Sequence, residues 1–208
     1  MPVLLDPGSW AFLMVVIGGY FLGSIPFGLL LTKLSGAGDL RQMGSGNIGA
    51  TNVLRTGHRG LAAATLVLDG GKGALSVYIG TIVVIPEAQE IGGLVAGACA
   101  VLGHNFSVWL RFRGGKGVAT TLGIMMASAP IIGAMASVTW IAMAIIFRYS
   151  SLAALIALAF APVFALLLGM NNPALMFSAL AVLGWVRHWA NIVRLLKGDE
   201  PHIGDSKV

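Results

Sequence analysis

The feature that most restricts the fold of this chain is a series of apolar runs, most of them about as long as a bilayer is thick. A helix that crosses the hydrocarbon core needs roughly 20 mostly apolar residues. Of the 208 residues, 57% are hydrophobic and only 10% are charged, whereas a soluble domain carries about 25% charged residues. The sequence therefore predicts an all-α integral membrane protein. Its candidate spans are Trp10–Thr32, Leu61–Ile85, Ile91–Leu110, Val118–Ala129, Ile131–Phe147, Leu152–Met170 and Ala174–Val193.

The fourth run, Val118–Ala129, is short, and joining it to the fifth across Pro130 would leave six spans instead of seven. The 13 Lys and Arg residues decide between these counts. With seven spans all of them lie on one side of the membrane, and the opposite segments carry only Asp6, Glu87 and Glu90. Basic residues concentrate in cytoplasmic loops. We therefore expect a bundle of seven transmembrane helices with a short or re-entrant fourth span, the N-terminus outside and the C-terminus cytoplasmic.

The rest of the organisation is simple. No repeat, long linker or low-complexity segment appears in residues 1–208, so we expect a single transmembrane domain. The one cysteine, Cys99, lies inside an apolar run, which excludes a disulfide framework and argues against a cysteine nucleophile. The start of the chain lacks the basic region and cleavage site of a secretory signal, so the first run is expected to remain as a helix.

The first of four polar clusters is RQMGSGNIGATNVLRTGHRG, residues 41–60. Its Gly44–Gly49 segment reads G-x-G-x-x-G, but a dinucleotide site would need a strand before it, and a membrane helix precedes it here. Glycines still allow backbone N–H groups to converge on an anion, and Arg55 offers a fork that fits phosphate. An ordinary basic connecting loop is the alternative. The further candidate donors are Ser45, Gly46, Asn47, Thr51 and Asn52.

The second cluster is LVLDGGKGALSVY, residues 66–78. Asp69 and Lys72 lie inside the second apolar run or at its mouth. Ionisable residues at such a depth are costly, and they are functional candidates for that reason. Their spacing of three residues also allows them to face each other on a helix, so a structural ion pair is the alternative.

The third cluster lies in GHNFSVWLRFRGGKGVATTLG, residues 103–123. A charge cluster that stops a helix at the membrane surface explains Arg111 and Arg113, but not the glycines around Lys116. The GGKG segment does not match the pattern of a P-loop. We predict that Lys116 binds a phosphate and that His104 packs against this turn or orients it. The glycines placed at the same phosphate are Gly114 and Gly115.

The fourth cluster is RHWANIVRLLKGDEP, residues 187–201. On a continuous helix, His188 and Asn191 would share one face, and Arg187, Asn191 and Arg194 would share an overlapping face. A histidine and an asparagine would then approach one volume beside several cations. The alternative is an amphipathic helix that lies on anionic lipid.

Together these clusters indicate a substrate with a phosphate at one end and an acyl chain at the other. Asp69 is an isolated acid among glycines, so the pair of acids expected at a Mg²⁺ site is missing, and we expect no metal and no cofactor. The acyltransferase pattern H-x-x-x-x-D is also absent. An enzyme built from these residues would act by positioning and charge stabilisation, with one histidine as a possible base.

Five ordered motifs resemble the bacterial acyl-phosphate:glycerol-3-phosphate acyltransferase family over nearly the whole chain. The resemblance implies a seven-helix enzyme of the bacterial inner membrane, with its site facing the cytoplasm. We expect it to act as a monomer and to have no nucleic-acid partner. It implies transfer of a fatty acyl group from acyl phosphate to the 1-position of sn-glycerol 3-phosphate, giving lysophosphatidate. The motifs are GSIPFG (23–28), GSGNIGATN (44–52), LDGGKG (68–73), GHNFSVWLRFRGGKGVAT (103–120) and RHWANIVRLLKGDE (187–200).

The resemblance also implies residue roles. Our own hypothesis for the mechanism is that His188 or the oxygens of the acyl phosphate accept the proton and that Asn191 or a backbone N–H stabilises the oxyanion. Glu200 matches a structural acid, and Ser151 is a weaker binding candidate. The implied catalytic residues are Ser45, Arg55, Lys116, His188 and Asn191. The glycine motif linked to glycerol 3-phosphate contributes Gly70, Gly71, Lys72 and Gly73.

A small transporter for a phosphorylated metabolite is the alternative function. A transport path would need polar groups near the middle of the bilayer. In this sequence the polar clusters gather at one face instead, which favours an interfacial enzyme.

Overall fold

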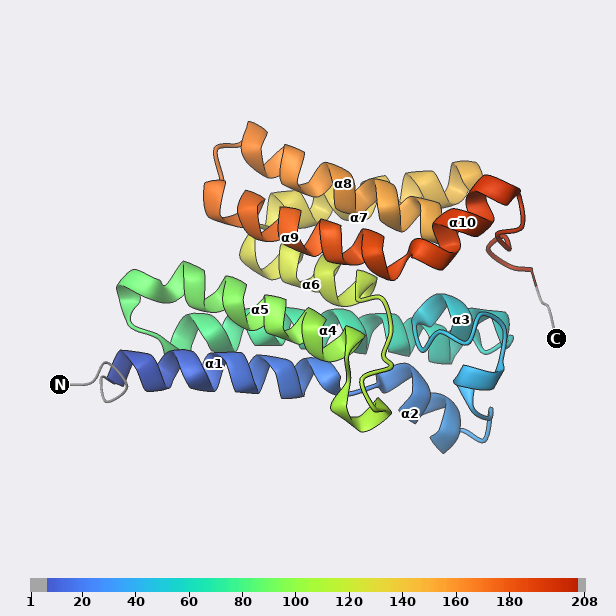
Figure 1. Ribbon diagram of the computed structural model, residues 1–208, viewed down its shortest axis with the longest axis horizontal. Coiled ribbons are helices and arrows are strands. Elements are labelled where there is room, and N and C mark those ends of the chain that lie inside the picture. Colours follow the sequence, from blue (N-terminus) through green and yellow to red (C-terminus); the bar gives the residue numbers. More distant parts are fainter. Residues whose placement is uncertain (1–6, 206–208) are drawn as a thin grey trace.

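The computed structural model describes residues 7–205, and all regular structure in that range is helical (Figure 1). This confirms the all-α prediction. Short 3-10 turns at Leu40–Gln42, Pro86–Ala88 and Val108–Leu110 link some of the helices. The helices are α1 Pro7–Ser24, α2 Phe27–Leu34, α3 Ala50–Arg55, α4 Arg59–Val83, α5 Gln89–Asn105, α6 Val118–Ser128, α7 Pro130–Phe147, α8 Ser150–Leu167, α9 Asn171–Arg187 and α10 Trp189–Lys197.

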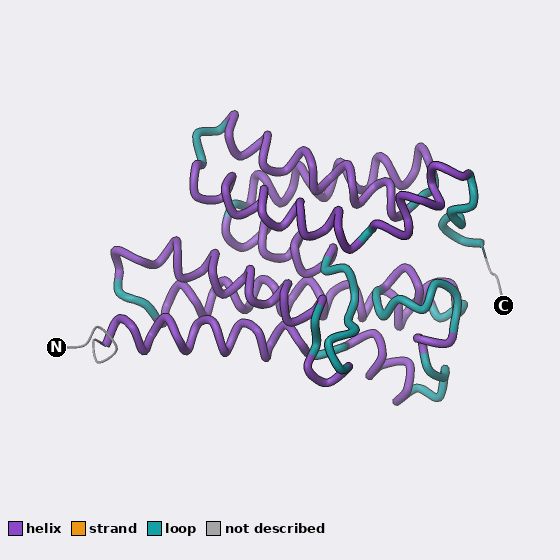
Figure 2. Tube along the Cα trace, in the orientation of Figure 1, coloured by secondary structure: helices purple, strands orange, loops and turns teal. Residues whose placement is uncertain are grey.

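The long helices run side by side in two groups, with α6 between them (Figure 1). Helices α1, α4 and α5 contact one another, α8 contacts both α7 and α9, and α6 contacts both α4 and α7. The short helices α2, α3 and α10 gather at one end of the bundle, together with the longest loops (Figures 1 and 2). The polar sequence clusters therefore meet at that end.

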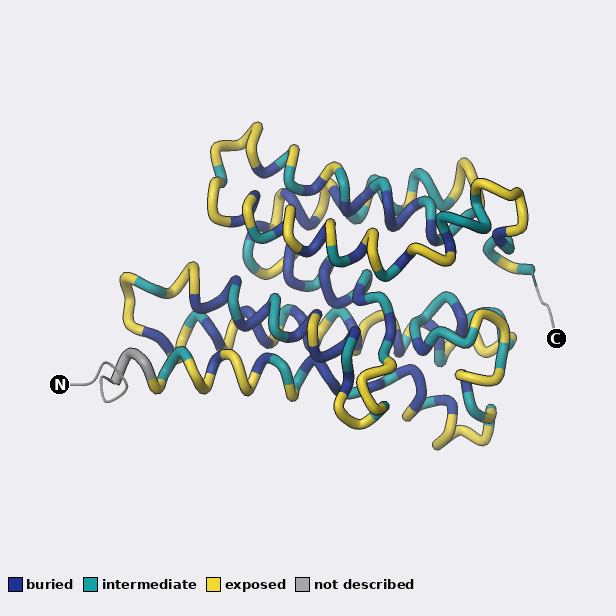
Figure 3. The backbone as a smooth tube through the Cα atoms, in the orientation of Figure 1, coloured by how far each residue is buried: buried dark blue, intermediate teal, exposed yellow. Residues whose placement is uncertain are grey.

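The surface of the bundle is that of a membrane protein. Within residues 7–205, five helical segments are long and apolar enough to cross a bilayer: Trp10–Leu34, Arg59–Val83, Pro86–Leu110, Pro130–Phe147 and Ser150–Leu167. Buried residues follow the contacts between helices, and exposed residues follow the outside (Figure 3). Many of the exposed residues are large and apolar, which is the pattern expected where lipid is the solvent. The chain is thus a multi-pass membrane protein.

Two of the expected spans are interrupted. The run Trp10–Thr32 is divided at Ile25–Pro26, because proline has no N–H to donate and disfavours helical backbone before it. The run Ala174–Val193 ends as a helix at Arg187, and α10 begins at Trp189. The prediction that His188 and Asn191 lie on one continuous helix was therefore wrong. The separation of the fourth and fifth runs at Pro130 is confirmed at the level of helices.

The close approach of α4 to α6 depends on glycine. A Cβ on Gly73 would collide with the backbone carbonyl of Thr120, and one on Gly123 would collide with the carbonyl of Gly70. Small residues allow the backbones of membrane helices to approach in this way. Gly73 therefore acts in helix packing, which corrects its assignment to substrate binding.

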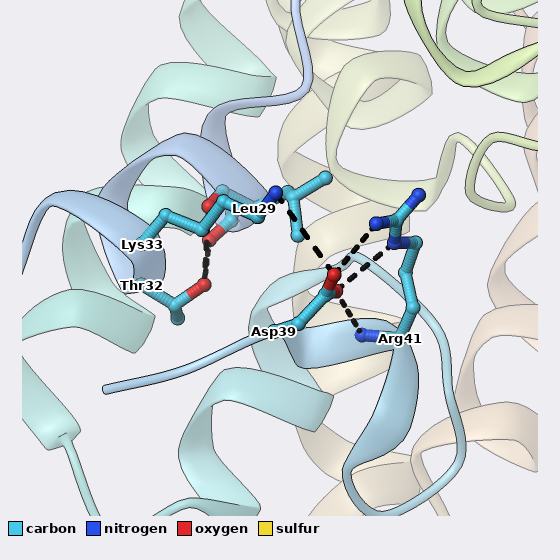
Figure 4. A network of polar contacts seen from close by, with 6 residues as sticks. Leu29, Thr32, Lys33, Asp39 and Arg41 are labelled. Atoms are coloured by element: carbon cyan, nitrogen blue, oxygen red, sulfur yellow. Dashed lines mark hydrogen bonds and ion pairs between the residues drawn. The ribbon is translucent and has the colours of Figure 1, made fainter. Parts of the chain in front are cut away.

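The loop after α2 is fixed by Asp39 (Figure 4). Its carboxylate accepts hydrogen bonds from the backbone N–H of Arg41 at 3.1 Å and from its guanidinium at 2.9 and 2.6 Å, and Lys33 lies 3.9 Å away. These bonds to Arg41 lower the pKa of Asp39 to about 2. Arg41 thus fixes Asp39 within the loop, and the contact of Asp39 with Lys33 joins the loop to α2.

Candidate active site

A cavity of about 570 Å³ lies at the end of the bundle where the polar clusters meet. It follows one stripe of α6 from Val118 to Met126, a helical rise of about 12 Å. All four sequence clusters contribute to its wall. The polar lining includes Ser45, Asn47, Thr51, Arg55, Lys116, His188, Asn191 and Glu200, and the apolar lining includes Leu66, Leu122, Met126, Trp140 and Ile141.

Asn52 organises the loop between α2 and α3. Its side chain is fully buried, and its amide nitrogen lies 2.8 Å from the carbonyl of Asn47 and 2.9 Å from that of Met43. Its amide oxygen accepts the backbone N–H of Ser45 at 2.9 Å. The expected role of Asn52 as a direct substrate donor is corrected to loop support. The N–H of Gly46 is likewise used within the loop, by the carbonyl of Met43.

Arg55 ends α3 with most of its guanidinium available. It reaches the carbonyl of Pro201 at 3.4 Å, while its Nε is buried and has no hydrogen-bond partner among residues 7–205. Burial lowers the pKa of Arg55, but arginine remains charged at such a site. Beside it, the hydroxyls of Thr51 and Ser150 lie 2.9 Å apart and join α3 to the start of α8. Arg55 is therefore free to bind an anion in the cavity.

Lys116 is linked to a carboxylate through Asn191. Its ammonium donates to the side-chain oxygen of Asn191, whose amide donates to Glu200 at 2.7 Å. Glu200 also accepts from Ser151 at 2.6 Å and from Arg194 at 2.8 Å. Burial lowers the pKa of Lys116 to about 8, although the charge of Glu200 acts in the opposite direction. Glu200 thus positions Asn191, Ser151 and Arg194, as its expected structural role requires.

His188 occupies the break between α9 and α10. Its Nδ1 lies 2.7 Å from the carbonyl of Gly184, so Nδ1 carries the proton and caps the last turn of α9. Nε2 of the neutral ring is then a hydrogen-bond acceptor at the cavity wall. Burial and the charge of Lys116 lower the pKa of His188 to about 4. His188 in this break and Asn191 on α10 line the same cavity.

The GGKG turn is attached to α5 through its backbone. The N–H of Gly115 donates to the carbonyl of His104 at 3.0 Å, and that of Gly114 donates to Asn105 at 3.1 Å. Arg187 donates from α9 to the carbonyls of both glycines, at 3.1 and 2.9 Å. These groups are used within the protein, so Gly114 and Gly115 position Lys116 and are not the expected phosphate ligands. Arg187 is likewise a clamp on the turn.

Asp69, Lys72 and His104 form a buried polar cluster, each less than 5% exposed. The ammonium of Lys72 lies 2.7 Å from Asp69, 2.9 Å from His104 Nδ1 and 2.8 Å from the carbonyl of Ile25. Asp69 and His104 reach the cavity wall, but Lys72 does not. The structure therefore favours the ion pair that was the alternative interpretation of this motif, and Lys72 is not a direct substrate ligand.

The other members of that motif are divided between two environments. Gly70 lines the cavity, whereas Gly71 is exposed on the outside of α4, where an added Cβ would meet no atom within 4 Å. Gly71 is therefore another residue whose expected contact with substrate is not supported.

Sequence reasoning missed the contribution of α7 and of the start of α8. Ser137, Trp140 and Ile141 line the cavity from one face of α7, and Ser150 lines it from α8. Trp140 and Ile141 follow Ser137 by three and four residues, which is the spacing of side chains on one face of a helix. They were overlooked because no charge or glycine marks them.

The apolar part of the cavity reaches the outer surface of the bundle. Leu66, Met126 and Ile141 line it, and they are 49%, 46% and 51% exposed. These side chains belong to α4, α6 and α7, whose outer faces are apolar. The cavity therefore has a side opening toward the lipid.

Comparison with known proteins agrees with this arrangement. The pattern that defines the family "Glycerol-3-phosphate acyltransferase" matches residues 13–198. Proteins of that name from Rhodospirillum rubrum and Paramagnetospirillum magneticum are 55% and 59% identical, and each alignment covers 92% of this chain and 90% and 93% of the relative.

Two solved structures are similar throughout. The crystal structure of PlsY (YgiH), an integral membrane glycerol 3-phosphate acyltransferase in its glycerol 3-phosphate form, has 37% sequence identity and a TM-score of 0.86, covering 93% of this chain and 96% of that one. The lysophosphatidic acid form has 35% identity and a TM-score of 0.84, covering 93% and 95%. Because the family pattern covers most of the chain and both named relatives are more than 50% identical over 92% of it, the chain belongs to the glycerol-3-phosphate acyltransferase family.

Proposed function

We propose that this protein transfers a fatty acyl group from acyl phosphate to the 1-hydroxyl of sn-glycerol 3-phosphate, giving lysophosphatidate and inorganic phosphate. The observation that carries the proposal is one cavity with cations at its polar end and lipid-facing residues at the other. An acyl phosphate likewise has a charged phosphate at one end and an apolar chain at the other. The names of the similar proteins support the acceptor, and the forms of PlsY include one with glycerol 3-phosphate and one with the lysophosphatidic acid product.

The cations account for binding of the two phosphates. Arg55 offers a guanidinium that lines the cavity and whose Nε has no partner among the described residues, and Lys116 is a charged donor whose turn is held by Arg187. Such groups bind phosphate strongly because charge-assisted hydrogen bonds are stronger than neutral ones. Ser45 and Asn47 extend this end of the cavity from the first loop. We assign these four residues to the two substrates together.

His188 is suited to orienting the acceptor alcohol. Its Nε2 can accept a hydrogen bond from the 1-hydroxyl, since Nδ1–H is committed to Gly184. A pKa of about 4 makes the ring a weak base, and efficient base catalysis needs a pKa near the working pH. We therefore assign the final proton acceptor to the departing phosphate, with His188 aligning the hydroxyl for attack.

The membrane arrangement follows from the same site. We place the polar end of the cavity at the cytoplasmic surface of the inner membrane, with seven spans and the C-terminus inside, because the basic residues gather there. Residues 1–208 then form one acyltransferase domain that acts as a monomer, since every group in the proposed mechanism comes from one chain.

The test is a product assay on purified protein in detergent. Labelled glycerol 3-phosphate is supplied with palmitoyl phosphate in one arm and palmitoyl-CoA in the other, each with and without EDTA. We expect lysophosphatidate from palmitoyl phosphate alone and no effect of EDTA. Product from palmitoyl-CoA would overturn the choice of donor. No product in either arm from folded protein would overturn the acyltransferase proposal, and uptake of glycerol 3-phosphate into liposomes would then test transport.

A further inference from the structure

The buried ammonium of Lys72 fixes the hydrogen-bonding state of His104. An ammonium has three N–H donors and no acceptor. Lys72 has three neighbours at hydrogen-bond distance: the carbonyl of Ile25 at 2.8 Å, Asp69 at 2.7 Å and His104 Nδ1 at 2.9 Å. The carbonyl of Ile25 and His104 Nδ1 are its hydrogen-bond partners, and Asp69 is its ion-pair partner. Nδ1 of His104 must present its lone pair to the ammonium, and the ring proton resides on Nε2.

Nε2 of His104 faces the turn that carries Lys116. A Cβ on Gly115 would collide with Nε2, so this atom lies directly against the turn, and His104 lines the cavity together with Lys116. Within residues 7–205, no hydrogen bond joins Nε2 to another residue. The structure thus presents an N–H donor, locked in one tautomer, beside the phosphate-binding lysine.

The Asn191 amide expected as a donor from the sequence already uses one of its two N–H groups. The side-chain oxygen of Asn191 accepts from Lys116, and its amide donates to Glu200. The backbone N–H groups of Gly114 and Gly115 donate to α5. The N–H groups of Gly114 and Gly115 and one N–H of Asn191 therefore have other partners, whereas His104 Nε2 has none among the described residues.

We propose that His104 donates the hydrogen bond that stabilises the oxyanion of the acyl-transfer step, an inference that rests on the proposed function. The hydroxyl oxygen of glycerol 3-phosphate forms a bond to the acyl carbonyl carbon, and the π electrons move onto the carbonyl oxygen, which accepts from Nε2–H. The oxyanion then collapses, and the bond from carbon to the phosphate oxygen breaks. Hydrogen phosphate leaves with the hydroxyl proton.

The position of His104 suits this role. It belongs to the last turn of α5, near the point where the lining changes from Lys116 to the apolar residues of α6. A carbonyl next to a phosphate on Lys116 would lie at this boundary. A neutral imidazole can act as such a donor in an enzyme, and a fixed donor in a site that excludes water is among the strongest contributions to catalysis.

The two histidines of the cavity then have complementary roles. The carbonyl of Gly184 fixes the proton of His188 on Nδ1 and leaves Nε2 as an acceptor for the alcohol. The ammonium of Lys72 fixes the proton of His104 on Nε2 and leaves that atom as a donor. In each ring a protein group at Nδ1 determines the function of Nε2.

Two amide substitutions separate donation from packing. In His104→Asn the side-chain oxygen can take the place of Nδ1 and accept from Lys72, but nothing reaches the position of Nε2. In His104→Gln the longer amide can place an N–H near the position of Nε2, but the acceptor for Lys72 is lost. We expect His104→Asn to lower kcat about 10²–10³-fold with KM nearly unchanged, as loss of one oxyanion donor does.

The Gln variant should show the opposite pattern. It should keep kcat within about tenfold of wild type and melt at a lower temperature, because a buried ammonium loses a partner. Both variants are compared with wild-type protein in the palmitoyl phosphate assay, with thermal unfolding in the same detergent. Near-normal kcat in His104→Asn would overturn the proposal, even if the Gln variant failed to fold. Equal losses of kcat in both would also overturn it.

This experiment is independent of the test of function. If wild-type protein makes lysophosphatidate and His104→Asn is unimpaired, only the role of His104 fails. If wild-type protein makes no lysophosphatidate from either donor, the acyltransferase proposal itself fails.

Discussion

At the scale of single residues, the site is built from groups whose remaining hydrogen-bonding capacity is set by their neighbours. Asn52, Asn191 and Gly115 carry polar groups that form hydrogen bonds with other parts of the protein. Arg55 and the Nε2 atoms of the two histidines are left for substrates. Which polar residue touches substrate is therefore decided by contacts between residues far apart in sequence.

The protonation of Lys116 predicts a pH limit. Its charged form exists below a pKa of about 8, so raising the pH through this value removes the charge that binds phosphate. We expect kcat/KM to be flat near neutrality and to fall above about pH 8, where substrate phosphates with a pKa of about 6 no longer titrate. The measurement is a pH profile of kcat/KM for glycerol 3-phosphate. Lys116→Arg is the control, since arginine keeps its charge and should abolish the fall. A flat wild-type profile would contradict the role of Lys116.

The second residue prediction concerns His188. If it aligns the hydroxyl and phosphate takes the proton, His188→Gln keeps an acceptor and should retain kcat within about tenfold, whereas loss of a general base costs about 10²–10⁴-fold. His188→Leu, which has no acceptor, should be much slower than the Gln variant. Steady-state kcat and KM for glycerol 3-phosphate distinguish these cases. A Gln variant as slow as the Leu variant would make His188 the base.

At the scale of elements, apolar length predicted where helices lie, and local geometry decided where they break. The ends of the fourth and fifth runs followed from Pro130, because proline acts through its own backbone. The break at Pro26 was equally local and was missed, since the apolar run continues through it. The break at His188 could not be found this way, because it depends on a side chain that caps Gly184 and on the contacts of Asn191.

The glycines of LDGGKG provide a test at this scale. Gly73→Ala would place a Cβ against the carbonyl of Thr120 on α6, and such overpacking costs about 1–3 kcal/mol. Gly71→Ala is the matched control, because its Cβ would meet open space and alanine favours a helix by up to about 1 kcal/mol. We expect Gly73→Ala alone to lower the melting temperature and Gly71→Ala to leave KM for glycerol 3-phosphate unchanged. A raised KM in a stable Gly71→Ala protein would restore the motif to substrate binding.

At the scale of the whole molecule, the sequence predicted that four distant clusters meet, and the structure brings them to one cavity. The reasoning succeeded because three of the four clusters lie at the ends of apolar runs, where the connecting segments of a membrane bundle are confined to its two surfaces. The apolar wall was not predictable in the same way. Leu66, Trp140 and Ile141 resemble any lipid-facing residue until the bundle is assembled.

The proposed orientation can be tested by labelling. In a Cys99→Ala background, cysteines are introduced singly at Glu87 and Lys197, which are exposed at opposite ends of the bundle. With an impermeant maleimide on intact cells, we expect Glu87→Cys to react at once and Lys197→Cys to react only after lysis. Retained acyltransferase activity serves as the control for folding. Reaction of both cysteines from outside would contradict the seven-span arrangement.

The side opening between α4, α6 and α7 has a kinetic consequence. An acyl substrate that enters between Leu66, Met126 and Ile141 comes from the bilayer and not from water. The concentration that governs the rate is then the mole fraction of acyl phosphate among the lipids. Adding inert phospholipid or detergent at constant total substrate should slow the reaction in proportion to the fall in the mole fraction of acyl phosphate. Diluting the aqueous phase should change only the dependence of the rate on glycerol 3-phosphate. The rate would thereby depend on a surface concentration for the acyl phosphate and on a volume concentration for glycerol 3-phosphate.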